Sequence, residues 1–256
     1  NMQLAVKDGE IYMIEVNPRA SRTVPFVSKA IGVPLAGLAA RCMAGETLDG
    51  LGFTREVELP YTAVKEAVFP FVKFPGVDIM LSPEMKSTGE VMSLDPDRGL
   101  AYLKSQLAAG SRLPYSGNVF LSVRDEDKPQ AVELARRLVK LGFDLYATLG
   151  TSTLLWNHGI KSRAIFRISR GRPNLLDLIQ EKQVQWIINT SENGAEAMVD
   201  ETRMRSQALA AGIPVTTTMA GMTAAIEGLT DKTEFGRFEV CSLQEYHRHL
   251  KPAGQR

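Results

Sequence analysis

Apolar and polar residues alternate at the start of the chain, and this pattern predicts two strands joined by a turn. Residues 1–6 and 11–16 have strand-like alternation, and Lys7-Asp8-Gly9-Glu10 between them is a hairpin signal. We expect an odd-length loop with Gly9 at positive φ, since one apolar face then fixes the register. The predicted apolar face consists of Leu4, Val6, Tyr12, Ile14 and Val16.

The opposite face of this hairpin is expected to carry polar side chains suited to a metal–phosphate site. Gln3, Glu15 and Asn17 would share it, because side chains two residues apart in a strand point the same way. Arg19 and Arg22 follow in the exit loop. Mg²⁺ prefers oxygen ligands and arginine matches phosphoryl oxygens. The alternative is a solvated surface hairpin, which is common in antiparallel sheets.

The middle of the chain predicts helices at 23–31 and 34–43, a strand over 54–68 broken by Pro60, and a helix at 98–109. Residues 110–118 (GSRLPYSGN) have the composition of a linker. We therefore expect a domain boundary there, between residues 1–112 and residues 118–256.

Strands and helices alternate with short connections in the second half, which predicts a doubly wound parallel α/β sheet. Ligands of such sheets bind outside the carboxyl ends of the strands. The predicted strands are 119–123, 144–147, 164–168, 186–188 and 214–216, and the predicted helices are 129–141, 153–158, 175–181, 201–211, 220–228 and 243–250.

Polar residues at the ends of these strands predict an anion site. The Thr148-Leu149-Gly150-Thr151 turn opens a helix, where backbone N–H groups and the helix dipole favour anions. Two nearby cations and further hydroxyl and amide groups complete the candidate effector-binding set: Ser122, Lys128, Thr148, Thr151, Arg167, Asn189 and Ser191. Thr148 and Thr151 taken alone could merely cap the helix.

Charge and cysteine usage exclude several other classes of function. A net charge of +1 over 256 residues offers no footprint for nucleic acid or for a membrane surface. No apolar run approaches the ~20 residues of a membrane span. Two separated cysteines, Cys42 and Cys241, are typical of a reducing cytoplasm. The three histidines have no zinc-like spacing with cysteine.

Three sequence features resemble the large subunit of carbamoyl phosphate synthetase: Gln3, the EVNPRASRTVPFVSKA run and the later KFPGVD…LSPEMKSTGEVM run. The resemblance covers the end of the second ATP-grasp unit and the methylglyoxal-synthase-like regulatory domain that follows. It implies that Gln3, Glu15 and Asn17 hold Mg²⁺ or Mn²⁺ on ATP, and that Arg19 and Arg22 handle the phosphoryl group passing to carbamate.

The resemblance also implies an overall reaction and its partners. Carbamoyl phosphate would form from bicarbonate, two ATP and ammonia released from glutamine by a small amidotransferase subunit, in a cytoplasmic homo-oligomer of heterodimers. UMP or IMP would bind the regulatory domain. Glu66 and Thr217 match positions that bind ornithine, although Val215 replaces the tyrosine of ornithine-responsive relatives. Because nothing before Gln3 could supply an adenine pocket, we expect the chain to be part of a larger protein and inactive alone.

Two other functions compete with this interpretation. A stand-alone nucleotide- or phosphate-binding regulatory module would have no use for a metal-binding hairpin. A methylglyoxal-synthase-like lyase would need carboxylates beside the phosphate to move protons. The GRPNLLD segment replaces the GGDQ-type aspartate segment of the lyase, and INTSENG stands where a second aspartate would be expected, so the sequence predicts an anion-binding pocket without a catalytic base.

Overall fold

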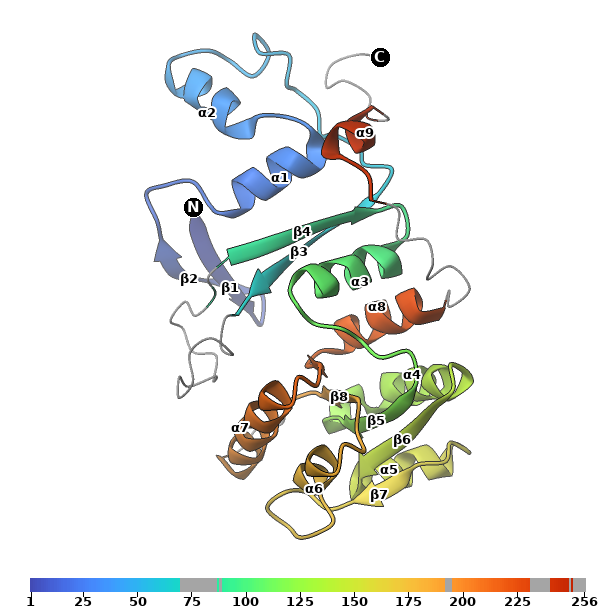
Figure 1. Cartoon of the computed structure of the whole chain (residues 1–256). Coiled ribbons are helices and arrows are strands. Elements are labelled where there is room, and N and C mark those ends of the chain that lie inside the picture. Colours follow the sequence, from blue (N-terminus) through green and yellow to red (C-terminus); the bar gives the residue numbers. More distant parts are fainter. Residues whose placement is uncertain (70–86, 88, 192–194, 231–239, 249, 251–256) are drawn as a thin grey trace. The chain divides into compact units, whose positions relative to one another are not determined.

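The computed structural model describes residues 1–69, 87, 89–191, 195–230, 240–248 and 250 (Figure 1). The chain forms two compact units, one of residues 1–63 with 239–256 and one of residues 64–238. The predicted linker at 110–118 does not separate these units, because the helix before it packs within the second one. Of the KFPGVD…LSPEMKSTGEVM run, residues 73–86 and 88 lie outside the described residues, and its last four residues belong to a described strand.

The first unit begins with the predicted hairpin of β1 (Met2–Lys7) and β2 (Glu10–Val16). The predicted odd-length loop is wrong. Lys7 pairs with Glu10, so the loop has two residues, and both Asp8 and Gly9 have positive φ as a type I′ turn requires. A bulge at Ile14 nevertheless places Gln3 and Glu15 on one face as predicted, because Leu4 faces Met13 while Gln3 faces Glu15.

This bulge changes the composition of the apolar face. Tyr12 pairs with Ala5 and therefore lies on the same face as Gln3, while Ile14 is the bulged residue, so both predictions were wrong. The apolar face instead carries Met2, Leu4, Val6, Ile11, Met13 and Val16, and more than half of each side chain is exposed.

Two helices and a C-terminal helix complete this unit: α1 (Thr23–Ile31), α2 (Leu35–Met43) and α9 (Leu243–His247). The buried Tyr61 donates its hydroxyl to the Ala30 carbonyl at 2.6 Å. His247 Nε2 donates to the Lys29 carbonyl at 2.7 Å, and Tyr246 packs edge-on against Tyr61. The C-terminal helix thus belongs to the same compact unit as the N-terminal hairpin.

A short sheet and one helix open the second unit. β3 (Thr62–Val68) pairs with β4 (Gly89–Asp95), and α3 (Arg98–Ala108) packs against β4 and α8. The predicted strand was too long, since residues 54–61 form no strand. Asp97 caps α3, because its carboxylate accepts a hydrogen bond from the Leu100 backbone N–H at 2.7 Å.

The predicted doubly wound sheet is confirmed, with the all-parallel strand order β7-β6-β5-β8-β9 (Figure 1). Its strands are β5 (Gly117–Ser122), β6 (Phe143–Thr148), β7 (Arg163–Ile165), β8 (Trp186–Asn189) and β9 (Val215–Thr216). Its helices are η2 (Asp125–Asp127), α4 (Lys128–Lys140), α5 (Leu149–Asn157), α6 (Leu175–Gln180), α7 (Ala195–Ala210) and α8 (Met219–Thr230).

Alternation along the central strands explains why both faces of the sheet are covered. In β5, Val119 and Leu121 belong to one buried cluster and Phe120 belongs to the other. The first cluster includes residues of α3, α4 and α8, and the second includes residues of α6 and α7. Both sheet faces are thus buried, as parallel sheets require.

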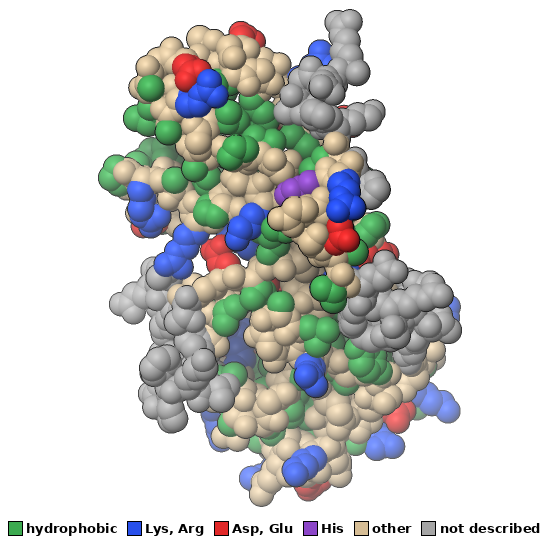
Figure 2. All heavy atoms as spheres, turned by 45° about the horizontal axis from the view of Figure 1, so that its top comes forward, with side chains coloured by type: hydrophobic (Ala, Val, Ile, Leu, Met, Phe, Trp, Pro, Cys, Tyr) green, Lys and Arg blue, Asp and Glu red, His purple; other side chains and the backbone are tan. Residues whose placement is uncertain are grey.

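The surface shows no concentration of charge on the face seen in Figure 2, where lysine and arginine side chains are dispersed among acidic and neutral ones. No single described helix is long and apolar enough to cross a membrane. Among the described helices, α1 and α2 taken together have the length and composition of a membrane span, although they are bent by 112° at the break between them.

Candidate functional sites

The hairpin brings its polar side chains onto one face. Gln3 lies directly opposite Glu15, and Asn17 donates its Nδ2 to Glu15 Oε1 at 2.8 Å. The Asn17 backbone N–H donates to the Asn1 carbonyl at 2.8 Å, so the polar residue is held at the end of the paired strands. All three candidate metal ligands therefore lie close together.

The donor types on this face fit a hard divalent cation. One carboxylate and two amide side chains supply oxygens, which Mg²⁺ and Mn²⁺ accept together with water and phosphate ligands. Glu15 is exposed and can turn toward a cation. No group of three or more histidine, cysteine, aspartate or glutamate side chains among the described residues could hold a metal, so this mixed set is the candidate the structure offers.

The two candidate catalytic arginines occupy the loop between β2 and α1. Arg19 donates Nη1 to the Ala20 carbonyl at 3.2 Å, and Arg22 precedes the first residue of α1. Both are exposed, and neither pairs with a carboxylate of the described residues. Their guanidinium groups are thus open to an anionic ligand.

The two candidate ornithine-binding residues are not joined in this structure. Glu66 in β3 accepts hydrogen bonds from Ser105 Oγ at 2.9 Å and from Gln106 Nε2 at 2.6 Å. Burial and the nearby Glu66 carboxylate raise the pKa of Tyr102 to about 12. Thr217 is exposed after β9, and no hydrogen bond between described residues links it to Glu66.

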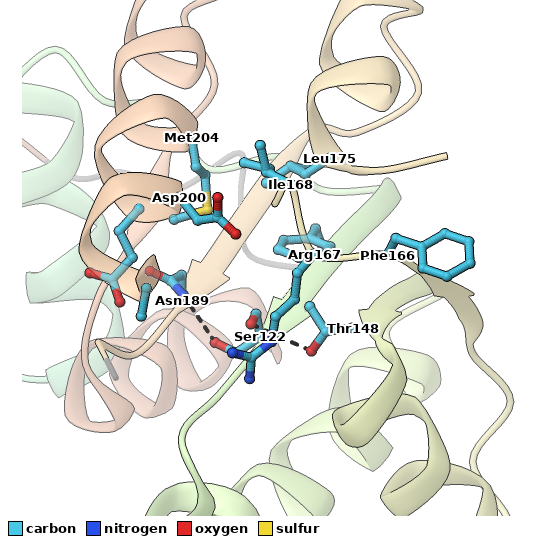
Figure 3. Close-up of a pocket in the computed structure, with 12 residues that line it drawn as sticks. Ser122, Thr148, Phe166, Arg167, Ile168, Leu175, Asn189, Asp200 and Met204 are labelled. Atoms are coloured by element: carbon cyan, nitrogen blue, oxygen red, sulfur yellow. Dashed lines mark hydrogen bonds between the residues drawn. The ribbon is translucent and has the colours of Figure 1, made fainter. Parts of the chain in front are cut away.

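A pocket lies at the carboxyl edge of the parallel sheet, where the fold predicts ligand binding (Figure 3). Ser122 ends β5, Thr148 ends β6, and Asn189 ends β8. Arg167 follows β7, and its side chain extends toward Ser122 in Figure 3. The structure thus brings four of the predicted residues together: Ser122, Thr148, Arg167 and Asn189.

The remaining predicted effector residues lie beside the pocket and do not line it. Thr151 is buried and accepts from Thr148 Oγ1 at 3.3 Å. Lys128 Nζ lies 3.8 Å from where a Cβ on Gly150 would stand, so it faces the turn that opens α5. Ser191 is engaged with α7, since it donates to Glu201 Oε2 and accepts from Arg205 Nη2, both at 2.9 Å.

One side-chain atom of the pocket residue Asn189 lacks a hydrogen-bond partner among the described residues. Its side chain is 6% exposed, and Nδ2 donates to the Ser122 carbonyl at 3.4 Å. Its Oδ1 is buried, and no other described residue gives it a hydrogen-bond partner. A buried acceptor without a partner lowers the stability of the folded state. A ligand that donates an N–H or O–H hydrogen bond to this oxygen would remove that penalty.

Sequence reasoning missed two carboxylates in the pocket wall, Asp200 and Glu201 of α7. The helix was predicted to begin at 201, whereas α7 begins at Ala195, which brings both residues onto its pocket side. Asp200 Oδ2 accepts from the Ser169 backbone N–H and hydroxyl, and Glu201 pairs with Arg205 at 3.0 Å. The sequence predicted a pocket without a catalytic base, and both carboxylates in its wall are engaged, Asp200 by hydrogen bonds and Glu201 by an ion pair.

The rim of the pocket also carries an ion pair that involves a predicted site residue. Lys128 Nζ lies 2.5 Å from Asp125 Oδ1 in the turn before α4. Lys128, and to a lesser degree Arg167, lowers the pKa of the Asp125 carboxyl below its usual range. Positive charge thus converges at this edge before any ligand arrives.

Two family models match regions of this chain that contain candidate site residues. The family of MGS-like domains matches residues 130–217, and the ATP-binding domain of the carbamoyl-phosphate synthase L chain matches residues 1–51. A solved methylglyoxal synthase from Elizabethkingia anophelis covers 44% of this chain at 17% identity and a TM-score of 0.37, with 79% of its own length covered. That likeness is weak, so the MGS-like assignment rests on the family match.

Similarity to curated proteins extends over almost the whole chain. The carbamoyl phosphate synthase large chain of Pasteurella multocida is 50% identical over 98% of this chain, and that of Archaeoglobus fulgidus is 51% identical over 96%. In both comparisons the chain spans 23% of the relative's length. The resemblance derived from the sequence motifs is confirmed.

Proposed function

We propose that this chain, which is similar over nearly its whole length to carbamoyl phosphate synthase large chains, supplies metal-binding and phosphoryl-binding residues for the final phosphoryl transfer of such an enzyme. The enzyme would be an ATP-dependent ligase that phosphorylates carbamate to carbamoyl phosphate, with Mg²⁺ or Mn²⁺ on the nucleotide. The observation that carries this proposal is the pairing of Gln3 with Glu15, with Asn17 hydrogen-bonded alongside. A pure sensor has no use for this face.

The residues of the hairpin unit have separate roles in this proposal. Gln3, Glu15 and Asn17 would hold the metal ion, which neutralises charge on the phosphates when it is bound. Arg19 and Arg22 would bind oxygens of the transferred phosphoryl group, because a guanidinium matches their geometry and charge. Phosphoryl transfer depends mainly on such positioning and charge stabilisation.

Two variants of the complete enzyme test this assignment. Glu15→Gln and Arg19→Ala should each abolish carbamate-dependent phosphoryl transfer, measured in reverse as ATP formation from carbamoyl phosphate and ADP. Bicarbonate-dependent ATP hydrolysis should persist at its ordinary rate. Loss of both partial reactions together would assign the hairpin to the other half-reaction, and retention of both would reject the metal site.

The pocket of the MGS-like region would serve regulation, with UMP or IMP as the nucleotide. Ser122, Thr148 and Arg167 supply two hydroxyls and a charge for a phosphate, and Asn189 Oδ1 offers an acceptor for the rest of the molecule. Lys128 would add a second positive charge from the rim, and Thr151 supports the cradle through Thr148. Phosphate binding at this helix start needs such donors.

A thermal-shift titration of the chain with UMP and IMP tests the regulatory pocket. A ligand at a hundredfold excess over its Kd stabilises the folded state by about 2.7 kcal/mol, which should raise Tm clearly. Lys128→Ala and Thr151→Val should each weaken the response. If neither nucleotide raises Tm, the turn from Thr148 to Thr151 serves only to cap α5. If UMP and free phosphate raise Tm equally, the pocket is an anion site without nucleotide specificity.

The alternatives are disfavoured by particular residues. A stand-alone regulatory module would explain the pocket and would leave the hairpin's polar face without a role. A methylglyoxal-synthase-like lyase would need a free base near the phosphate, whereas Asp200 and Glu201 are held by hydrogen bonds and an ion pair. Ornithine binding at Glu66 and Thr217 is the less favoured regulatory proposal, because Val215 replaces a tyrosine.

The remaining parts of the proposal follow from the same assignment. The large chain would work in the cytoplasm with a small glutamine amidotransferase subunit, in a homo-oligomer of heterodimers, and without nucleic acid or membrane. This chain by itself should show no carbamoyl phosphate synthesis. Detectable synthesis from ammonia, bicarbonate and ATP by the purified chain would contradict that expectation.

A further inference from the structure

The turn before α4 carries three consecutive carboxylates, and they face different cations. Asp127 Oδ2 accepts from Arg124 Nε at 2.8 Å, and Glu126 lies 3.3 Å from the same nitrogen. Asp125 turns the other way, to Lys128 Nζ at 2.5 Å. Only Asp125 of the three therefore engages a cation that we assign to the effector pocket.

We propose that Asp125 is an internal competitor for the anionic ligand of this pocket, because its carboxylate occupies Lys128 until a phosphate group replaces it. This inference rests on the proposed nucleotide site. The carboxylate would leave Lys128 as the ligand's phosphate arrives, and the ion pair would set the ligand concentration at which the site fills.

The exposure of the pair makes such an exchange easy. The Asp125 side chain is 89% exposed and that of Lys128 is 27% exposed. Exposed ion pairs are weak, and a freed carboxylate at this position returns directly to water. A phosphate carries more charge than one carboxylate and also meets Arg167 and the Thr148 hydroxyl, so it should displace Asp125 readily.

A second role for Asp125 must be separated from this one. Acidic residues near the first turn of a helix stabilise the helix through its dipole, and all three carboxylates precede α4. Asp127 provides a matched control, because it lies in the same turn and carries the same charge, yet it pairs with Arg124. Asp125→Asn and Asp127→Asn therefore change net charge equally and differ in which cation they release.

Isothermal titration of the whole chain with UMP and with inorganic phosphate at low salt tests the proposal. Asp125→Asn should tighten the Kd for both ligands by about two- to fivefold, the range expected for one exposed ion pair. Asp127→Asn should change the Kd much less. In a Lys128→Ala background, Asp125→Asn should not tighten the Kd, because the cation for which Asp125 and the phosphate compete is absent. Circular dichroism at matched temperature checks that every variant keeps its helices.

Three results would overturn the inference. An unchanged or weaker Kd in Asp125→Asn, with wild-type binding intact, rejects the competitor and leaves the nucleotide site standing. Equal tightening by both asparagine variants assigns the effect to net charge. Absence of binding in both wild type and Asp125→Asn rejects the nucleotide site itself, and the competitor with it.

Discussion

Gly99 of α3 and Gly228 of α8 meet backbone to backbone. A Cβ placed on Gly99 would lie 2.3 Å from the Gly228 backbone nitrogen, closer than real Cβ contacts allow. Beside them Arg98 pairs with Glu227 through Nη2 at 2.6 Å. The two helices can approach this closely only because neither position carries a side chain.

Replacing the first of these glycines should separate the two helices. Gly99→Ala forces a methyl group against backbone that cannot move aside, so we expect a loss of about 1–3 kcal/mol of unfolding free energy. Differential scanning calorimetry should show Tm falling by about 2–4 °C for each kcal/mol. Gly37→Ala in α2 is the control, because its Cβ position is open and alanine favours helix. Equal effects of the two variants would contradict a specific α3–α8 contact.

The metal assignment can be tested without enzymatic activity. Mn²⁺ added to the isotope-labelled chain should broaden the NMR signals of Gln3, Glu15 and Asn17 before those of other residues. Glu15→Gln should suppress this broadening, since it removes the only carboxylate of the set. Glu10→Gln is the control, because Glu10 lies on the same face at the turn end of the hairpin. Broadening that survives Glu15→Gln and centres on another acidic cluster would disprove the site.

Asn189 should have opposite effects on stability and on ligand binding. Asn189→Leu keeps the number of side-chain heavy atoms and removes the buried Oδ1, which has no partner among the described residues, so unfolding free energy should stay level or rise. The same change should weaken UMP binding about tenfold or more, because the ligand's donor loses its acceptor. Denaturant unfolding and calorimetric titration measure the two effects. A structural role for the amide would instead lower stability and leave any binding defect secondary.

Tyr102 should make the chain less stable at high pH. Its pKa of about 12 in the folded state lies above the ordinary value of 10.0, so the folded protein holds the phenolic proton more tightly than the unfolded chain does. Stability should therefore fall as pH rises above about 10, by about 1 kcal/mol at pH 11 from this group. Tyr102→Phe should flatten the pH dependence of urea unfolding between pH 9 and pH 11. An unchanged slope would show that burial does not hold the proton.

The sheet and its ligand edge could be predicted because they depend on local patterns. Short apolar runs ending in polar residues mark β5, β6 and β8, and the parallel fold places their ends together. Ser122, Thr148 and Asn189 were assigned to one site in this way, and all three line the same pocket in the structure. Arg167 was found for the same reason, since it follows β7.

Other features depend on tertiary contacts that local patterns do not encode. No glycine or proline marks the bulge at Ile14, so the loop length was predicted incorrectly, while the shared face of Gln3 and Glu15 was predicted correctly. Asp200 was missed because α7 begins six residues earlier than predicted, at Ala195 instead of Glu201. The compact units divide elsewhere than at the linker because Gly99 packs α3 onto α8.

The return of α9 to the first unit has a consequence for limited proteolysis. Residues 64–238 are inserted within a unit that begins at Asn1 and resumes at 239, so the polypeptide crosses between the units twice. A protease that cuts one crossing leaves the other intact. After a cut between α8 and α9, the contacts of described residues that hold the C-terminal peptide to the first unit would include His247 to Lys29 and Tyr246 to Tyr61. Gel filtration of the nicked protein would therefore report the strength of that small interface directly.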